Sequence, residues 1–142
     1  MSGFLLDTNV LSEINRPRPD RNVVAFLSSQ PLEALFVSSV TFAEIRYGIE
    51  RLTDTARRKL LDDWLQHKLR PMFAQRILDV TEDIMLRWRL LLEEGRQRGH
   101  TFSQPDLIIA ATALHHGLTV VTRDIREFDA AGTPVFNPWL AR

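Results

Sequence analysis

A short apolar run that ends in an acid, Phe4-Leu5-Leu6-Asp7, lies near the start of the sequence. The run predicts a short buried strand, with Asp7 at the point where the strand ends and a helix begins. Ligands of open α/β sheets gather at the carboxyl ends of the strands, so Asp7 is expected where chemistry takes place. Asp is also a good helix cap, and this stretch alone leaves both roles open. The deciding question is whether other acids converge on Asp7.

Strand-like and helix-like segments alternate along the rest of the chain. Short apolar or β-branched runs predict four further strands, over residues 35–38, 76–80, 118–122 and 133–136. Apolar residues at helical spacing occupy the segments between them. This alternation predicts an α/β fold of three layers, α/β/α, in which helices cover both faces of a central, mainly parallel sheet of about four to five short strands.

The middle of the chain carries two consecutive helical patterns. Residues 40–52 and 53–69 predict a helical hairpin, which Pro71 is expected to end because proline cannot continue a helix. A later helix opens at Thr81, and glycine is expected to end it at Gly95 and Gly99.

The composition is that of an ordinary soluble globular protein, and the 142 residues predict one domain, 1–142. The sequence has no cysteine, which excludes disulfides, cysteine-based zinc sites and thiol nucleophiles. The formal net charge is zero, so any binding of nucleic acid must come from a local basic patch. Neither a signal peptide nor a membrane-spanning run is recognisable, and we expect a cytoplasmic protein without membrane contact.

Four acids stand where predicted elements meet: Asp7, Glu44, Asp106 and Asp124. Each has a purely structural alternative, because residues 41–44 and 103–106 fit capping boxes and Asp124 fits a turn cap. Taken together they favour a site. Parallel strands bring Asp7 and Asp124 to one edge of the sheet, and helices that begin near that edge add Glu44 and Asp106.

Clustered carboxylates raise one another's pKa and destabilise a fold unless a cation lies among them. Mg²⁺ and Mn²⁺ prefer oxygen ligands, and such ions can activate water for phosphodiester hydrolysis. Thr8, Asn9 and Thr122 are expected either to orient the acids and waters or simply to cap local helices.

The ordered set of motifs resembles the PIN-domain proteins, and more narrowly the VapC/FitB-type toxins of bacterial toxin–antitoxin modules. The resemblance rests on LLDTNVLS at 5–12, VTFAEIRYG at 40–48, DLIIAATA at 106–113, VTRD at 121–124 and NPW at 137–139.

This resemblance implies a Mg²⁺- or Mn²⁺-dependent endoribonuclease that forms a homodimer, able to assemble further with a cognate antitoxin that silences it. It also implies that the antitoxin lays an apolar helix in a groove and directs an Arg toward the acids. The acidic set maps onto Asp7, Glu44, Asp106 and Asp124. Many relatives carry Asn in place of Asp124 and an Asp a few residues later, where this chain has Glu127, so the division of the fourth role between Asp124 and Glu127 is open.

Our mechanistic hypothesis is that Asp7, Asp106 and Asp124 hold the metal while Glu44 holds or polarises the attacking water. Arg46 and Arg123 are candidates for contacts with the RNA backbone, because phosphate contacts usually come from Arg and Lys.

Two alternatives remain open at this point. One is a non-catalytic PIN-like module that only binds a partner. The other is an aspartyl-phosphate phosphatase, which would need a second acid at the position of Asn9.

Overall fold

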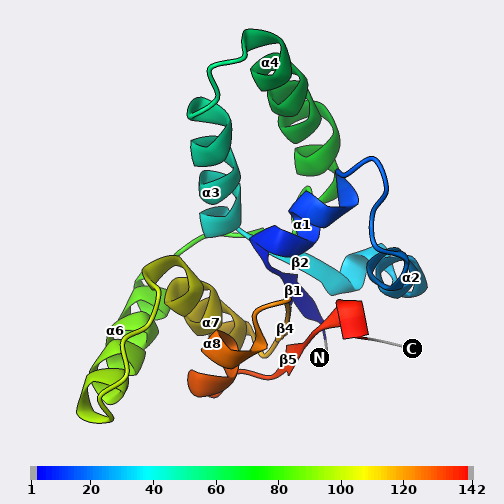
Figure 1. Ribbon diagram of the computed structural model, residues 1–142. Coiled ribbons are helices and arrows are strands. Elements are labelled where there is room, and N and C mark those ends of the chain that lie inside the picture. Colours follow the sequence, from blue (N-terminus) through cyan, green and yellow to red (C-terminus); the bar gives the residue numbers. More distant parts are fainter. Residues whose placement is uncertain (1–2, 141–142) are drawn as a thin grey trace.

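The computed structural model describes residues 3–140 and contains one five-stranded sheet with every pair of neighbouring strands parallel (Figure 1). The order across the sheet is β3-β2-β1-β4-β5. The strands are β1 (Phe4–Leu6), β2 (Leu35–Ser38), β3 (Ile77–Leu78), β4 (Thr119–Val121) and β5 (Val135–Phe136). The expected parallel α/β fold is confirmed.

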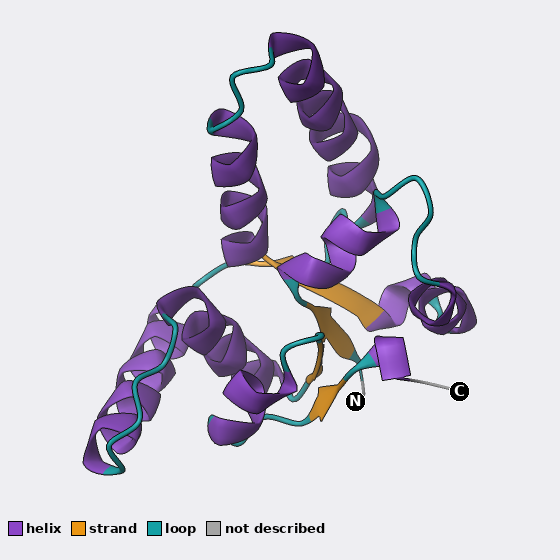
Figure 2. Ribbon diagram, viewed as in Figure 1, coloured by secondary structure: helices purple, strands orange, loops and turns teal. Residues whose placement is uncertain are grey.

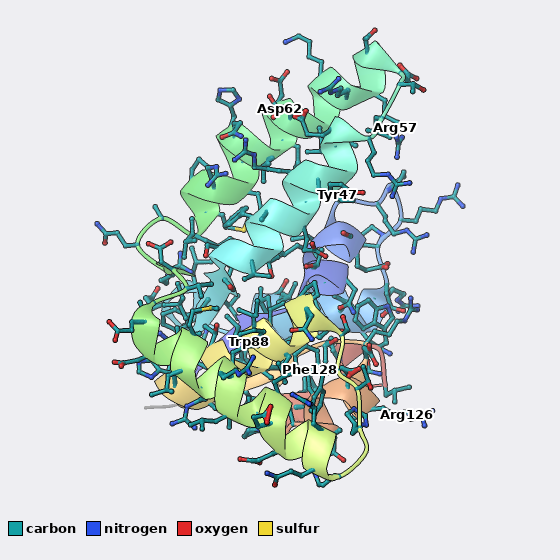
Figure 3. The ribbon with its side chains drawn as sticks, turned by 90° about the vertical axis from the view of Figure 1, so that its left-hand side faces the viewer. Tyr47, Arg57, Asp62, Trp88, Arg126 and Phe128 are labelled. Carbon is teal, nitrogen blue, oxygen red and sulfur yellow. The ribbon has the colours of Figure 1, made fainter. Side chains whose placement is uncertain are left out.

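Eight α-helices connect the described strands or flank the sheet (Figure 2). They are α1 (Thr8–Ile14), α2 (Arg21–Ser29), α3 (Ser39–Glu50), α4 (Thr55–Trp64), α5 (Arg70–Met72), α6 (Glu82–Gln97), α7 (Gln104–His116) and α8 (Ile125–Ala130). The predicted hairpin is α3 with α4, which rises from the rest of the molecule in Figure 1. Figure 3 shows Tyr47 and Arg57 on this hairpin, apart from Trp88 on α6 and Phe128 on α8.

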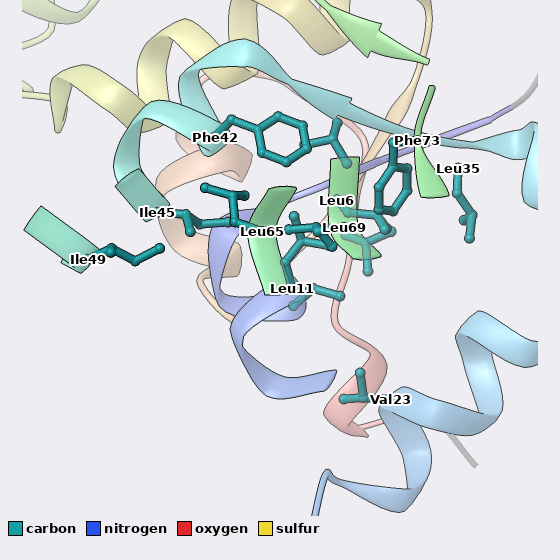
Figure 4. Packing of buried hydrophobic residues seen from close by; sticks show 13 residues of the cluster. Leu6, Leu11, Val23, Leu35, Phe42, Ile45, Ile49, Leu65, Leu69 and Phe73 are labelled. Carbon is teal, nitrogen blue, oxygen red and sulfur yellow. The ribbon is translucent and has the colours of Figure 1, made fainter. Parts of the chain in front are cut away.

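The two faces of the sheet bury two separate hydrophobic clusters. Side chains alternate along a strand, so Leu6 and Val121 join the cluster under α1, α2, α3 and the end of α4, which Figure 4 shows from close by. Leu5 and Val120 join the cluster under α7 and α8. The helices that cover these clusters form the two outer layers of the predicted α/β/α arrangement.

The strand order reverses at β1, because β2 lies on one side of it and β4 on the other. In open parallel sheets ligands bind outside the carboxyl ends of the strands at such a switch point. Asp7 follows β1 directly, and its backbone N–H donates to the carbonyl of Val121 at 3.0 Å. The topology therefore brings the end of β1 beside the end of β4, as expected for Asp7 and Asp124.

Both predicted capping boxes are wrong. The α3 helix begins at Ser39, the hydroxyl of Ser38 accepts the Val40 N–H at 3.0 Å, and Thr41 is buried inside the helix. Ser103 does precede α7, but its side chain makes no cap hydrogen bond. Pro105 has no N–H to donate there. Glu44 and Asp106 are thus free of the capping roles that the spacing suggested.

The predicted helix ends at Pro71 and Gly95 need correction. A π-helical segment, Leu65–Leu69, links α4 to α5, and helical backbone continues through Pro71 to Met72. The wider π turn relieves the clash of a proline ring with the preceding turn. Gly95 lies inside α6, where Phe102 packs so closely that only glycine fits without a shift. Gly99, with φ +73°, does follow the end of the helix. The short helix α8 was not predicted.

No helix in the range 3–140 is both long and apolar enough to cross a membrane.

Two glycine substitutions test this packing. A Cβ at Gly95 would lie 2.7 Å from Cε2 of Phe102, whereas a Cβ at Gly48 on α3 would meet nothing within 4 Å. We expect Gly95→Ala to lower stability by about 1–3 kcal/mol through overpacking, and Gly48→Ala to raise it by roughly 0.5–1 kcal/mol through helix propensity. Urea unfolding measures both, and a gain from Gly95→Ala would contradict the close contact with Phe102.

Candidate active site

The four predicted acids line one cavity of about 590 Å³ at the carboxyl edge of the sheet. Asp7 comes from the end of β1, Glu44 from α3, Asp106 from the first turn of α7, and Asp124 from the loop after β4. They differ in exposure: Asp7 is only 5% exposed, Asp106 is half-buried, and Glu44 and Asp124 are exposed. The structure therefore brings together acids that are up to 117 positions apart, the difference between 124 and 7.

Two hydrogen bonds hold the carboxylate of Asp7. One carboxylate oxygen accepts the backbone N–H of Thr8 at 2.8 Å, and the other accepts the hydroxyl of Thr122 at 2.9 Å. The same hydroxyl accepts the N–H of Asp124 at 2.9 Å and the side-chain amide of Asn9 at 3.3 Å. Thr122 and Asn9 thus link Asp7 to the loop that carries Asp124, while Thr8 contacts Asp7 through its backbone. Asp7 also caps α1, and its capping role does not remove it from the cavity.

The acids repel one another. Burial first, and then the nearby carboxylates of Asp7, Asp124, Glu127 and Glu44 in that order, together raise the pKa of Asp106 to about 7. Burial also raises the pKa of Asp7, against the lowering effect of its hydrogen bonds from Thr122 and Thr8. A cation in the cavity would remove both penalties.

The chemistry of the donor set fits a hard divalent ion, because carboxylate oxygens dominate the cavity. Among residues 3–140, however, no three His, Asp or Glu side chains form a ready-made metal site. Mg²⁺ needs only one or two direct carboxylates and keeps several waters, so this set of acids suits a partly hydrated ion.

Glu127 lies on α8, next to the main cavity. Its Oε1 atom is 3.7 Å from Nε2 of His100, and both atoms are buried without a hydrogen-bond partner among the described residues. Glu127, Asp124 and His100 line a separate hollow beside the acid cavity. The carboxylate of Glu127 is close enough to raise the pKa of Asp106, but it is not among the residues that line the main cavity.

One part of the cavity lining, which we call the basic wall, is basic and aromatic. Arg16, Arg123 and Trp139 line it, and the Arg123 guanidinium carbon lies 4.6 Å from the centroid of the Trp139 ring. Arg46, the other predicted RNA contact, is exposed on α3 and is not among the lining residues. Sequence reasoning missed a role for Trp139, although its place just after the last strand could have suggested one.

Glu13 was also missed. This acid lines the cavity but is only 6% exposed, and its carboxylate accepts from Arg16 at 3.2 Å and from the Asp20 N–H at 2.8 Å. Its partners are local, so Glu13 holds together the turn between α1 and α2.

A second, more apolar hollow of about 560 Å³ adjoins the acid cavity between α1, α3 and α4. Its apolar lining includes Ile45, Ile49, Leu61 and Trp64, with Gly48 among them. It shares four lining residues with the acid cavity, namely Thr8, Ser12, Arg16 and Glu44. We call this hollow the hairpin groove.

Comparison with known proteins gives consistent matches over nearly the whole chain. Toxin FitB of Neisseria gonorrhoeae is 42% identical, and the alignment covers 96% of this chain and 98% of FitB. VapC ribonuclease Y4jK of Sinorhizobium fredii is 37% identical, with 96% of this chain and 97% of Y4jK covered. The crystal structure of FitAcB from Neisseria gonorrhoeae has a chain that superposes with a TM-score of 0.91 at 41% identity, covering 96% of this chain and 99% of that one.

Residues 4–133 match the sequence model of the PIN domain. This range contains all four acids and every strand but β5. The resemblance seen in the motifs is confirmed, and the chain belongs to the PIN-domain family.

Proposed function

We propose that this chain is a divalent-metal-dependent endoribonuclease and the toxin of a toxin–antitoxin pair. The observation that carries the proposal is the convergence of four acids from four separate elements on one cavity at the switch point of the sheet. The names of its relatives supply the substrate class and the biological role, since they include a toxin and a ribonuclease.

The bound ion would supply charge neutralisation around the scissile phosphate and would help to ionise the attacking water. Asp7, Asp106 and Asp124 would hold it, some of them through water. Glu44 is exposed and is suited to accept the proton of the water. The water oxygen bonds to phosphorus, the bond from phosphorus to the 3′ oxygen breaks, and the 3′ oxygen takes up a proton. The products are a 5′-phosphate and a 3′-hydroxyl.

Thr122 and Asn9 have a positioning role in this proposal. Thr122 donates to Asp7 and accepts from the backbone of Asp124, so one hydroxyl sets the separation of two acids. The hydrogen bond from Asn9 to Thr122 at 3.3 Å keeps that hydroxyl oriented.

We further propose that the hairpin groove receives an apolar helix of the cognate antitoxin. The groove is apolar along Ile45, Ile49, Leu61 and Trp64, which suits the apolar face of a helix. It opens onto Glu44 and the acid cavity, so a basic side chain at the edge of such a helix could pair with the acids.

The expected homodimer and the cytoplasmic location stay predictions. Leu86 and Leu90, one helical turn apart on α6, are 59% and 55% exposed and offer an apolar face that a subunit contact would cover. Membership of the PIN-domain family displaces the phosphatase alternative. A non-catalytic binding module is distinguished from an enzyme by the first experiment below.

The first prediction concerns the central acid. Replacing Asp7 with Asn removes a carboxylate without changing the size of the side chain. Mutating residues that only orient metal ligands lowers metal affinity or activity by about 10- to 100-fold. For Asp7, a proposed direct ligand, we expect the rate of cleavage of total cellular RNA in Mn²⁺ to fall by more than about a hundredfold. The melting transition should stay near that of the wild type.

Asp62→Asn, at an exposed site on α4, is the matched control and should cleave normally. Equal rates for Asp7→Asn and wild type would refute the assignment, and a wild type inactive with every metal would favour the binding module.

The second prediction concerns pH. The folded pKa of Asp106, about 7, exceeds its ordinary value of 3.8, so the folded chain binds more protons than the unfolded chain between these values. Stability in EDTA should therefore fall as the pH rises from about 4 through 7. Asp106→Asn should flatten this decline, and Mg²⁺ or Mn²⁺ should raise the melting temperature of the wild type above pH 7 more than that of the variant. Parallel melting curves for the two proteins would contradict the mutual repulsion.

The third prediction concerns the hairpin groove. Gly48 has open space above it, so Gly48→Phe should fill the groove while leaving the core intact. Overpacking a contact costs about 1–3 kcal/mol, so we expect the cognate antitoxin to bind roughly 5- to 150-fold more weakly while RNA cleavage persists. Leu60→Phe, exposed on the same hairpin but outside the groove, is the control. Unchanged antitoxin affinity in Gly48→Phe would place the antitoxin elsewhere.

A further inference from the structure

The basic wall of the acid cavity has a layered construction. The guanidinium carbon of Arg123 lies 4.6 Å from the centroid of the Trp139 ring, and both side chains line the cavity. Arg123 is exposed and Trp139 is half-buried, so the guanidinium forms the outer layer and the indole the inner one. Arginine stacks well on aromatic faces because its guanidinium is planar and weakly hydrated.

The inner layer is firmly anchored. The backbone N–H of Trp139 donates to the side chain of Asn137 at 2.9 Å, and its carbonyl accepts from the side chain of Asn22 at 3.0 Å. Trp139 also packs against the cluster that contains Leu6 and Val121. The ring is thus held by both the hydrogen bonds and the core, and it restrains the guanidinium above it.

Arg123, the outer layer, is next to Asp124 in the chain, and no ion pair within the described residues neutralises its charge. Arg123 is the residue between Thr122 and Asp124, and its backbone N–H donates to Asn9 at 3.4 Å. Its neighbour on this wall, Arg16, is paired with Glu13, whereas Arg123 makes no ion pair with any residue in the range 3–140. A planar cation is therefore available one residue from a proposed metal ligand.

We infer that Arg123, held over the Trp139 ring, is a stacking platform for the base of the nucleotide next to the scissile phosphate of a single-stranded RNA. This inference rests on the proposed nuclease function. Unstacked bases bind on aromatic rings or guanidinium planes, and each stacked base is worth about 5- to 150-fold in affinity. A base can reach the platform only when it is free of a duplex, so the arrangement selects loops and single strands.

The experiment compares two oligomers of equal charge in EDTA, where no metal supports cleavage. One is fluorescein-labelled octauridylate, and the other is the same phosphate chain without bases. We expect the full-length wild type to bind octauridylate about fivefold or more tightly than the abasic oligomer, measured by fluorescence anisotropy. Arg123→Lys keeps the charge but loses the plane, so it should bind the abasic oligomer as the wild type does and lose the preference for bases.

Variants at the inner layer complete the test. Trp139→Ala should lose most of the preference, and Trp139→Phe, which keeps a flat ring, should retain it and guard against a folding defect. Arg89→Lys, at an exposed site on α6 that does not line the cavity, should change neither affinity. Wild-type protein that binds both oligomers equally or not at all, or an Arg123→Lys variant that keeps the preference, would overturn the platform.

Cleavage in Mn²⁺ separates this inference from the proposed function. Wild-type cleavage without a base preference in binding would overturn the platform and leave the nuclease intact. If the chain prefers the oligomer with bases but fails to cleave RNA with any metal ion, the proposed nuclease function is overturned and the platform is supported as an RNA-binding site alone.

Discussion

The parallel pairing of β1 with β4 is the constraint on which the rest of the site depends. Leu6 is in register with Val121, and the N–H of Asp7 donates to the Val121 carbonyl at 3.0 Å. This pairing carries Asp7 and Thr122 off the sheet side by side. The hydroxyl of Thr122 then donates to Asp7 and accepts from Asp124, so the ladder of the sheet continues into the cavity as side-chain hydrogen bonds. A shift of one residue in this register would turn Leu6 and Val121 to the opposite face and separate the acids.

The acids weaken the fold that positions them. Asp7 is almost fully buried and Asp106 half-buried, and both have a raised pKa because burial and neighbouring carboxylates disfavour their charged forms. Such a group of acids lowers the free energy of unfolding. Burial of the two hydrophobic clusters on either side of the sheet must offset this loss. Thr122 reduces the cost at Asp7 by donating to its carboxylate. The exposed positions of Glu44 and Asp124 let water screen the rest.

Much of this arrangement could be predicted because strands leave a strong signal. The apolar run before Asp7 and the β-branched run before Thr122 identified two strand ends, and parallel topology then placed them together. Local alternatives were harder to judge. The spacing of residues 41–44 matches a capping box, but the helix begins earlier because Ser38 is the actual cap. Gly95 reads as a helix end, but it is required by the approach of Phe102, a contact that no local pattern reveals.

The residues of the basic wall show the same limit of local patterns. Trp139 meets Arg123 only through the return of the chain after β5, and Asn22 helps to hold it from another helix. Spacing along the chain carries no information about such contacts. Glu127 illustrates the opposite case, since the sequence drew attention to it but the structure sets it beside His100, next to rather than inside the main cavity.

Because the hairpin groove and the acid cavity share Thr8, Ser12, Arg16 and Glu44, they are not independent binding sites. Whatever occupies one of them alters the surface that the other offers. By thermodynamic linkage, a groove ligand that weakens binding in the cavity is itself weakened, by the same factor, when the cavity is filled. Control of such a site needs no signal relayed through the core, since Glu44 faces both hollows from a single turn of α3. A cavity already filled with RNA would, for the same reason, resist capture by a partner in the groove.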